Sequence, residues 1–258
     1  MEALSLVFVA LFGLAWGSFL NVVIYRLPRR MNIVRPPSAC PACGARIKPY
    51  DNIPVLSYLW LGGKCRRCRA RIGLTYPTVE ILTALAFVLL GLKFGLGPEF
   101  AAAAVFTSGL IALGFIDAFH RILPDVLTLP GFGLGLVYAL VRRDGLDILQ
   151  ALLGAAVGSG FLLLIYGGYW LLRRKEGLGL GDVMMMLMVG AFLGWIHALL
   201  VIVLASLAGT VIGLTLVRLR KADFQSALPY GTFLAPAAFV ALVWGDALMT
   251  AYLRLFRR

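Results

Sequence analysis

The chain has 258 residues, of which 61% are hydrophobic and only 14% are charged, and its formal net charge is +12. Soluble globular proteins carry a charge on about a quarter of their residues, so this composition excludes an ordinary soluble domain and indicates a bilayer as the solvent. The basic excess indicates membrane topology and attraction to anionic lipid rather than nucleic-acid binding, because no nucleic-acid-binding motif accompanies it.

The first apolar segment covers residues 3–25 and is long enough to span a bilayer as a helix. Glu2 precedes it instead of the basic segment of a signal peptide, and its apolar stretch is longer than a signal peptide requires. We therefore predict that residues 1–25 form an uncleaved transmembrane helix and the first domain.

All four cysteines lie in the next segment, residues 26–76, as Cys40-Pro-Ala-Cys43 and Cys65-Arg-Arg-Cys68 with 21 residues between the pairs. Two such pairs can bring four thiolates to one tetrahedral centre, which is the pattern of a structural zinc site. We predict that all four bind Zn²⁺ and that the metal folds a domain too small to bury a core. Two disulfides are the alternative, which a cytoplasmic location disfavours.

Residues 26–76 also carry eleven Lys and Arg against one acid, Asp51. Cytoplasmic loops of membrane proteins collect basic residues, so we place this segment in the cytoplasm. The same orientation puts 18 Lys and Arg inside and six outside. Three of the six, Arg254, Arg257 and Arg258, lie at a C-terminus that eight spans would place outside, and seven spans would remove this conflict.

The remaining chain, residues 77–258, is predicted to form the third domain, a bundle of membrane helices. The predicted fold class is an all-α polytopic membrane protein with about eight spans and a small zinc-binding loop domain. The sixth span is short and is separated from the seventh only by a brief break at Gly194, so six to eight spans fit the sequence. The candidates are residues 3–25, 77–96, 99–118, 125–141, 147–172, 182–195, 197–217 and 231–253.

Two acids lie at cytoplasmic ends of predicted spans, where ionisable side chains are costly and become functional candidates. Asp117 ends the third span, and Asp182 begins the sixth. Two carboxylates about 4 Å apart repel each other by about 4 kcal/mol at an effective dielectric near 20, so a pair that meets shares one proton. One acid can then activate water while the other polarises a peptide carbonyl, as in aspartic proteases. The alternative is structural, with Asp182 as a helix cap and Asp117 as an interfacial charge.

Neighbouring residues suggest the roles of the two acids. A helix N-terminus favours an anion and a C-terminus disfavours it, so we expect Asp182 to be ionised and Asp117 to be protonated. Gly179 and Gly181 are expected to let the backbone before Asp182 run extended or with positive φ, close to a substrate. Asp125 is expected to cap a helix, with a supporting role in the site as the less favoured interpretation.

A series of short motifs follows the chain in order, and together they are far more specific than any one alone. On these motifs the chain resembles the type IV prepilin leader peptidases, a family of bifunctional bacterial membrane enzymes, over nearly its whole length. The motifs are Gly17–Pro28, Cys40–Gly44, Asp51–Ser57, Cys65–Cys68, Tyr76–Glu80, Asp117–Asp125, Gly179–Asp182 and Pro229–Ala235.

The resemblance implies an aspartic endopeptidase of the bacterial inner membrane in which Asp117 and Asp182 are catalytic. Members remove a basic leader from type IV prepilins or type II secretion pseudopilins at the cytoplasmic face. Many then methylate the new N-terminus with S-adenosylmethionine, an activity associated with the zinc-binding loop. The implied cofactors are structural Zn²⁺ and S-adenosylmethionine, and the implied partners are the pilin substrate and membrane lipids, without nucleic acid. No glycine-rich fingerprint in the sequence locates the methyl donor.

Four residues depart from the family pattern. Phe119 and Met184 stand where members often have an acid and a lysine, each two residues after a catalytic aspartate. Asp51 stands where glutamate is common, and Thr232 where proline is common. Neither Phe119 nor Met184 replaces a member of the acid pair itself, but auxiliary roles at these two positions do not carry over.

Two other classes of function use some of the same features. A proton-coupled transporter can use paired aspartates, but its sites lie more often near the membrane midplane between inverted repeats, and no internal repeat is present. A non-enzymatic scaffold of pilus or secretion assembly would explain the cysteine loop but would leave the acid pair without a purpose. The sequence favours the peptidase.

Overall fold

The computed structural model describes residues 3–141, 147–174, 179–219 and 228–255. These residues are predominantly helical and pack as two compact units, Met1–Ala112 and Leu113–Arg258, which divide within helix α4 (Pro98–His120). The domain boundaries expected after residues 25 and 76 stay predictions.

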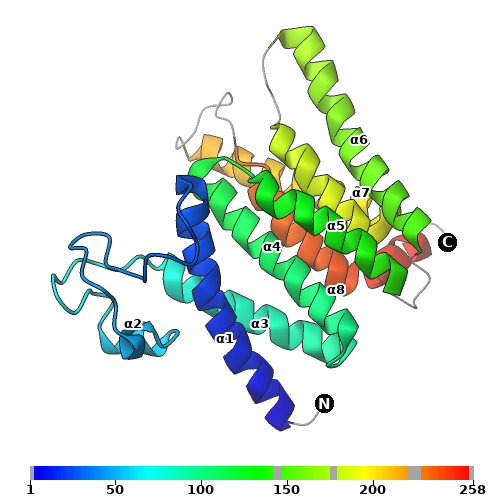
Figure 1. Cartoon of the computed structure of the whole chain (residues 1–258). Helices are drawn as coiled ribbons and strands as arrows, with labels where there is room; N and C mark the ends of the chain where they lie inside the picture. The colour runs from blue at the N-terminus through cyan, green and yellow to red at the C-terminus, as the bar shows by residue number, and fades with distance from the viewer. Residues whose placement is uncertain (1–2, 142–146, 175–178, 220–227, 256–258) are drawn as a thin grey trace. The chain divides into compact units, whose positions relative to one another are not determined.

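The first unit contains α1 (Ala3–Arg26), α3 (Thr75–Phe94) and the first part of α4 (Figure 1). Between α1 and α3 lie two short 3₁₀ helices, Leu27–Arg29 and Pro49–Asn52, and the five-residue helix α2 (Leu56–Trp60). Gly17 of α1 lies against α3, where an added Cβ would come within 2.7 Å of the Cα atom of Glu80. Small residues let membrane helices approach this closely, since lipid offers no hydrophobic drive for helices to associate.

The second unit contains the rest of α4, then α5 (Asp125–Val141), α6 (Ile148–Arg173), α7 (Leu180–Arg218) and α8 (Gly231–Leu255) (Figure 1). The first part of α7 forms the core of this unit, because most of its side chains from Asp182 to Leu193 are buried. Helices α5, α6 and α8 pack around α7.

Helix α7 is broken at Gly194, where φ is 77° and ψ is 172°. Beyond the break, the Ser206 hydroxyl oxygen lies 3.0 Å from that of Tyr230, and the next residue, Gly231, lies near the Asp182 carboxyl group. A continuous helix would carry residue 206 about 36 Å beyond Asp182 at 1.5 Å per residue. The chain therefore reverses direction at Gly194, which is the break predicted between the sixth and seventh spans.

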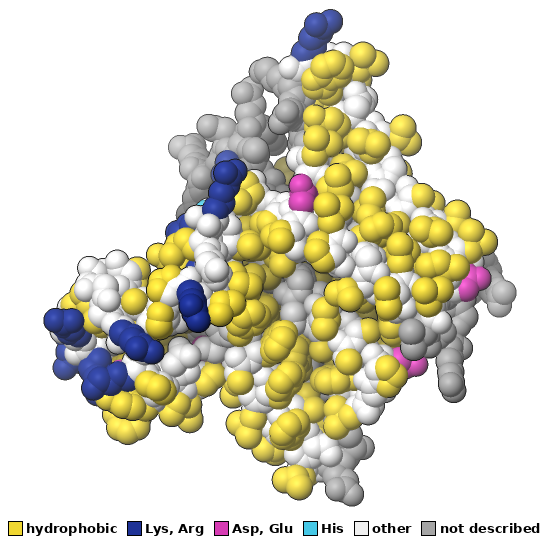
Figure 2. Space-filling model, in the orientation of Figure 1, with side chains coloured by type: hydrophobic (Ala, Val, Ile, Leu, Met, Phe, Trp, Pro, Cys, Tyr) yellow, Lys and Arg dark blue, Asp and Glu magenta, His cyan; other side chains and the backbone are white. Residues whose placement is uncertain are grey.

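Six described helices, α1, α3, α4, α6, α7 and α8, are long and apolar enough to cross a membrane, and α5 is a shorter apolar helix. Large hydrophobic side chains are exposed along them, as expected for surfaces that contact lipid (Figure 2). The predicted fold class, an all-α multi-pass membrane protein, is confirmed. The break at Gly194 divides α7 into two helical parts, residues 180–193 and 195–218. With these parts and α5 counted separately, the described residues contain the eight predicted apolar segments. The first part of α7 is short for a full crossing of the membrane.

Helices α6 and α7 meet through glycines. Gly154 of α6 lies directly against the backbone of Gly190 and Gly194 of α7, and Gly158 lies against Met186. Residues four apart share one face of a helix, so Gly154 with Gly158 and Gly190 with Gly194 form two facing strips of small residues. The contact is backbone to backbone and leaves no room for a Cβ atom at Gly154.

We predict that Gly154→Ala destabilises the protein by about 1–3 kcal/mol, because the added methyl group overlaps the backbone of α7. Gly160→Ala is the matched control on the same helix, since nothing lies within 4 Å of a Cβ atom there. Thermal unfolding of the full chain in detergent measures the difference. Equal unfolding temperatures for the two variants would contradict the packing described above.

Candidate active site and metal centre

Asp117 and Asp182, 65 residues apart in the sequence, meet in the second unit. Asp117 lies near the end of α4 and Asp182 in the first turn of α7, and their exposed fractions are only 5% and 6%. The two carboxyl groups are close enough to interact electrostatically, and the backbone N–H of Gly231 lies near both. The structure thus brings the two predicted site acids together at one end of the helices.

Asp117 receives its hydrogen bonds from the first turn of α8. The backbone N–H of Thr232 donates to Oδ2 at 2.8 Å, and the Thr232 hydroxyl donates to the same oxygen at 3.2 Å. The carbonyl oxygen of Gly114 lies farther from that hydroxyl, at 3.4 Å, so the single hydroxyl proton favours Asp117. The free N–H groups and the dipole of a helix N-terminus also favour negative charge on the acid they face.

Asp182 has fewer donors. Its Oδ2 accepts a hydrogen bond from the Gly179 backbone N–H at 3.2 Å. Its Oδ1 is buried and has no hydrogen-bond partner among the residues that the structure describes. A buried carboxylate oxygen without a donor is unfavourable when ionised, so Oδ1 is suited to carry a proton or to contact a water molecule or a substrate.

Small residues make room beside the acids. A Cβ atom at Gly231 would come 3.0 Å from Asp117 Oδ2 and 2.9 Å from Leu123 Cδ1, and one at Gly181 would come 2.9 Å from Leu123 Cβ. Gly179 is extended, with φ at −80°, and Gly181 is not among the residues with positive φ. Gly179 is therefore extended as predicted, whereas the prediction was wrong for Gly181, which lies in the first turn of α7; there the requirement is space rather than an extended or left-handed backbone.

The contributions of Tyr230, Gly231 and Thr232 were missed by the sequence analysis. The Tyr230 hydroxyl lies 3.0 Å from Ser206 Oγ and donates to the carbonyl oxygen of Ile202 at 3.3 Å, which fixes the segment leading into α8. The signal was present in the Pro229–Ala235 motif, which places a glycine at the start of an apolar helix. Only the structure shows that this helix starts at the acid pair.

The other candidates lie at the periphery. Asp125 is the exposed first residue of α5, where an acid stabilises the helix N-terminus. It is thus within the first turn rather than the residue before it. Phe119 is exposed, with its ring 6.2 Å from that of Phe115, and Met184 is half-buried.

The four cysteines gather in the first unit. Their Sγ atoms all lie within 4.8 Å of one another, and those of Cys40 and Cys68 are 3.8 Å apart. Tetrahedral zinc with Zn–S bonds of about 2.3 Å requires sulfurs about 3.8 Å apart, so the four residues fit the metal. All four cysteine thiols are free, so the structure does not contain the two disulfides that were the alternative to a zinc site.

The two cysteine pairs occupy equivalent backbone turns. The Cys40 N–H donates to the carbonyl oxygen of Ala45 at 2.9 Å, and the Cys65 N–H donates to that of Ala70 at 2.8 Å. Backbone N–H groups of Cys68 and Arg67 lower the pKa of Cys65 to about 6. A thiol that is deprotonated near neutral pH is a ready metal ligand.

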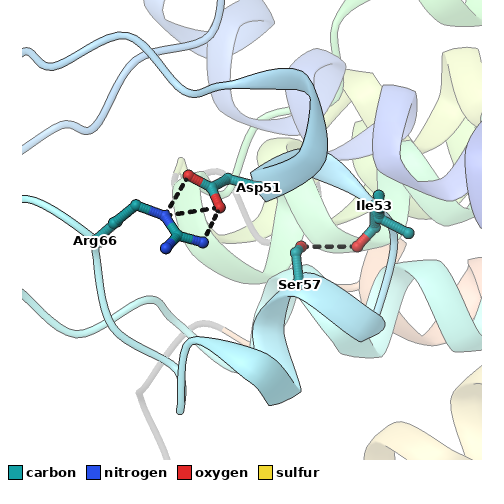
Figure 3. Close-up of polar contacts among 4 residues, drawn as sticks. All are labelled: Asp51, Ile53, Ser57 and Arg66. Atoms are coloured by element: carbon teal, nitrogen blue, oxygen red, sulfur yellow. Dashed lines mark hydrogen bonds and ion pairs between the residues drawn. The ribbon is translucent and has the colours of Figure 1, made fainter.

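The segment between the cysteine pairs is tied to the second turn by an ion pair (Figure 3). Arg66 Nη2 donates to Asp51 Oδ1 at 2.6 Å, and Arg66 Nε donates to both carboxylate oxygens. These hydrogen bonds lower the pKa of Asp51 below its usual value. In the same view, the Ser57 hydroxyl donates to the carbonyl oxygen of Ile53 at 2.7 Å, where α2 begins.

Each cysteine turn closes on a residue with positive φ, Gly44 at 67° and Arg69 at 60°. A left-handed backbone costs a non-glycine residue about 1 kcal/mol, so we predict that Gly44→Ala weakens zinc binding and that Arg69→Gly leaves it equal or tighter. Chelator competition on the zinc-loaded full chain measures both effects. The same loss of affinity in both variants would show that the two turns are not equivalent.

Two buried acids at the ends of membrane helices and a four-thiol cluster define the class: a multi-pass membrane protein with a candidate aspartic active site and a candidate metal centre. Family models agree with this description. Residues 11–94 match the bacterial peptidase A24 N-terminal domain, and residues 104–214 match the type IV leader peptidase family. No solved structure matched the chain.

Curated relatives cover most of the chain. It is 41% identical over 269 residues to the prepilin leader peptidase/N-methyltransferase of Pseudomonas aeruginosa, covering 95% of this chain and 92% of the relative. It is 40% identical over 274 residues to the Aeromonas salmonicida protein of the same name, with 96% and 93% covered. The Myxococcus xanthus protein of that name is 45% identical over 210 residues, which cover 81% of this chain and 62% of the relative. The chain belongs to the type IV leader peptidase family and is an enzyme of that family.

Proposed function

We propose that this enzyme is an aspartic endopeptidase that removes the basic leader from type IV prepilins or pseudopilins. Cleavage takes place at the cytoplasmic face of the bacterial inner membrane, and methylation of the new N-terminus follows. The observation that carries the proposal is the meeting of Asp117 and Asp182, both buried, beside a common amide at Gly231. The names of the relatives, which include both activities, support it.

The hydrogen bonds support a division of labour between the acids. Asp117, which accepts from both the N–H and the hydroxyl of Thr232, carries the negative charge and takes a proton from the attacking water. Asp182, whose Oδ1 has no described partner, carries the shared proton and gives it to the carbonyl oxygen of the scissile bond. The leaving amine then takes the proton held by Asp117, and Asp182 recovers its proton from one hydroxyl group of the intermediate as the C–N bond breaks and the carbonyl group forms again.

This assignment is the reverse of the one expected from the sequence. Judged by its own helix, Asp117 lies at a C-terminus, where a negative charge is unfavourable. The first turn of α8 outweighs that effect because its donors contact the carboxylate directly, whereas the dipole of α4 acts without a hydrogen bond. The roles of the two acids are part of the proposal.

The position of the site along the helices favours a protease over a proton relay. Leu123, Gly181 and Gly231 place three chain connections next to the acids, and the predicted topology assigns all three to the cytoplasmic side. His197 Nε2 lies 3.3 Å from Asp246 Oδ1, 15 residues along α7 and α8 from Asp182 and Gly231. The acids are therefore at one end of the helices and not at the middle, where transporter sites usually lie.

The cysteine cluster supports the second activity indirectly. Cys40, Cys43, Cys65 and Cys68 would hold Zn²⁺ in a closed site, so the metal would shape the loop and have no open position for a substrate. S-adenosylmethionine, when bound, supplies an electrophilic methyl group for the new N-terminal amine. The partners proposed are the pilin substrate and membrane lipids, and nucleic acid is not among them.

We predict that co-expression of the chain with a prepilin yields a shortened pilin, and that Asp117→Asn and Asp182→Asn each reduce processing by about 10³-fold or more, because neither can share the proton. Asp246→Asn is the matched control, since its side chain is exposed and lies 15 residues along α8 from Gly231. Gel mobility of the pilin measures processing. Undiminished processing by both site variants would remove the peptidase assignment.

Methylation of the mature pilin is measured in the same co-expression cultures. Mass spectrometry of the mature pilin is expected to show one additional methyl group on its N-terminal residue. Cleaved pilin without that group would restrict the function to the peptidase step.

The role of Thr232 predicts a pH effect. In Thr232→Val the hydroxyl donor to Asp117 is lost, so the base is protonated more easily and a higher pH is needed to ionise it. The acidic limb of the pH–rate profile should move to higher pH by about one unit, which corresponds to one hydrogen bond to a charged group. Thr232→Ser keeps the donor and should retain the original limb. Identical limbs in all three proteins would assign Thr232 a packing role only.

A further inference from the structure

We infer that α2 is an interfacial helix, which inserts Leu56, Leu59 and Trp60 into the surface of an anionic bilayer and holds the cysteine loop against the membrane. The proposed function gives α2 no role, and this inference does not depend on the identity of the catalytic residues.

One face of α2 is apolar and exposed. Trp60 is 85% exposed, Leu59 68% and Leu56 64%. These positions are related as i, i+3 and i+4, so the three side chains lie on the same face of the helix. Large apolar side chains grouped on one face of a charged module mark an interaction surface.

The opposite face of α2 is already occupied by the loop itself. The half-buried Tyr58 directs its hydroxyl toward the carbonyl oxygen of Ile72 at 3.5 Å, and Gly63 lies against its ring. The Ser57 hydroxyl donates to the carbonyl oxygen of Ile53 (Figure 3). The loop therefore folds over one side of α2 and leaves the Trp60 side outward.

A hydrogen bond sets the position of α2 relative to the membrane helices of its own unit. The Val55 N–H, immediately before α2, donates to Glu80 Oε2 at 2.8 Å. Glu80 is buried in the second turn of α3, against Gly17 of α1. At 1.5 Å per residue, Glu80 lies only about 8 Å along α3 from its first residue, so α2 begins at the depth of the lipid head groups.

Val55 has φ at 60° and ψ at −49°, a conformation that a β-branched residue adopts only where its surroundings hold it. The bond to Glu80 is one such restraint. The attachment of α2 to α3 is therefore a fixed feature of the fold, and the exposed face of α2 is held at a defined level.

The charge around α2 indicates what this exposed face binds. Residues 26–76 carry eleven Lys and Arg, and their single acid, Asp51, is paired with Arg66. Figure 2 shows basic side chains beside hydrophobic ones on the part of the surface where Figure 1 places α2. This charge attracts anionic head groups and repels both a basic leader peptide and a second copy of the same loop. Tryptophan is also enriched at the level of the head groups.

Fluorine NMR of the zinc-loaded full chain tests the inference. The protein is labelled with 5-fluorotryptophan and reconstituted into vesicles of phosphatidylethanolamine and phosphatidylglycerol, and Trp60→Phe identifies the Trp60 resonance. A lipid that carries a nitroxide near its head group is expected to abolish this resonance, whereas a water-soluble gadolinium chelate leaves it intact. Loss of the signal with gadolinium alone would mean that α2 faces water, and resistance to both probes would mean that protein covers it; either result overturns the inference.

Lipid composition tests the electrostatic part. In vesicles of phosphatidylcholine alone, the nitroxide lipid should broaden the Trp60 resonance less than in anionic vesicles. The Trp244 resonance, assigned through Trp244→Phe, is the comparator, because Trp244 is an exposed residue of α8. An identical response of Trp60 in both lipids would overturn the requirement for anionic head groups.

Discussion

A carboxylate inside a membrane protein is stable only where donors replace the water that it has lost. Asp117 meets this requirement at the first turn of α8, where Thr232 and Gly231 present their donors to it. The ends of α4, α7 and α8 must therefore meet at one point, and Tyr230 holds the segment before α8 in place. The pairing of Asp117 with Asp182 follows from this meeting of helix ends.

Close helix packing makes the meeting possible. Gly154 and Gly190 bring α6 and α7 into backbone contact, and Gly231 leaves room for Leu123 and the Asp117 carboxyl group, which a Cβ atom there would crowd. In lipid, where apolar side chains gain little by leaving their solvent, such contacts supply much of the packing energy. Glycines that look like ordinary membrane-helix composition in the sequence are thus specific contacts in the structure.

The first unit contains a small polar segment, residues 26–76, that is too short to bury a core of its own. Its two cysteine turns repeat the same backbone pattern around four thiols, and the bond from Val55 to Glu80 joins the loop to α3. A metal at the cysteines and a lipid surface under α2 would restrain the loop from two sides. Asp51 forms an ion pair with Arg66 through both carboxylate oxygens, which ties the segment between the cysteine pairs to the second turn.

The sequence by itself determined the features that depend on local spacing: the apolar segments, the break at Gly194, the two cysteine pairs and the two acids at helix ends. Each is encoded within a few residues by helix length, turn chemistry or ligand spacing. Only the tertiary structure decided which groups surround the acids, because the Thr232 donors come from 115 residues beyond Asp117. The charge proposed for Asp117 is opposite to the one expected from its own helix for the same reason, since the Thr232 donors contact the carboxyl group directly.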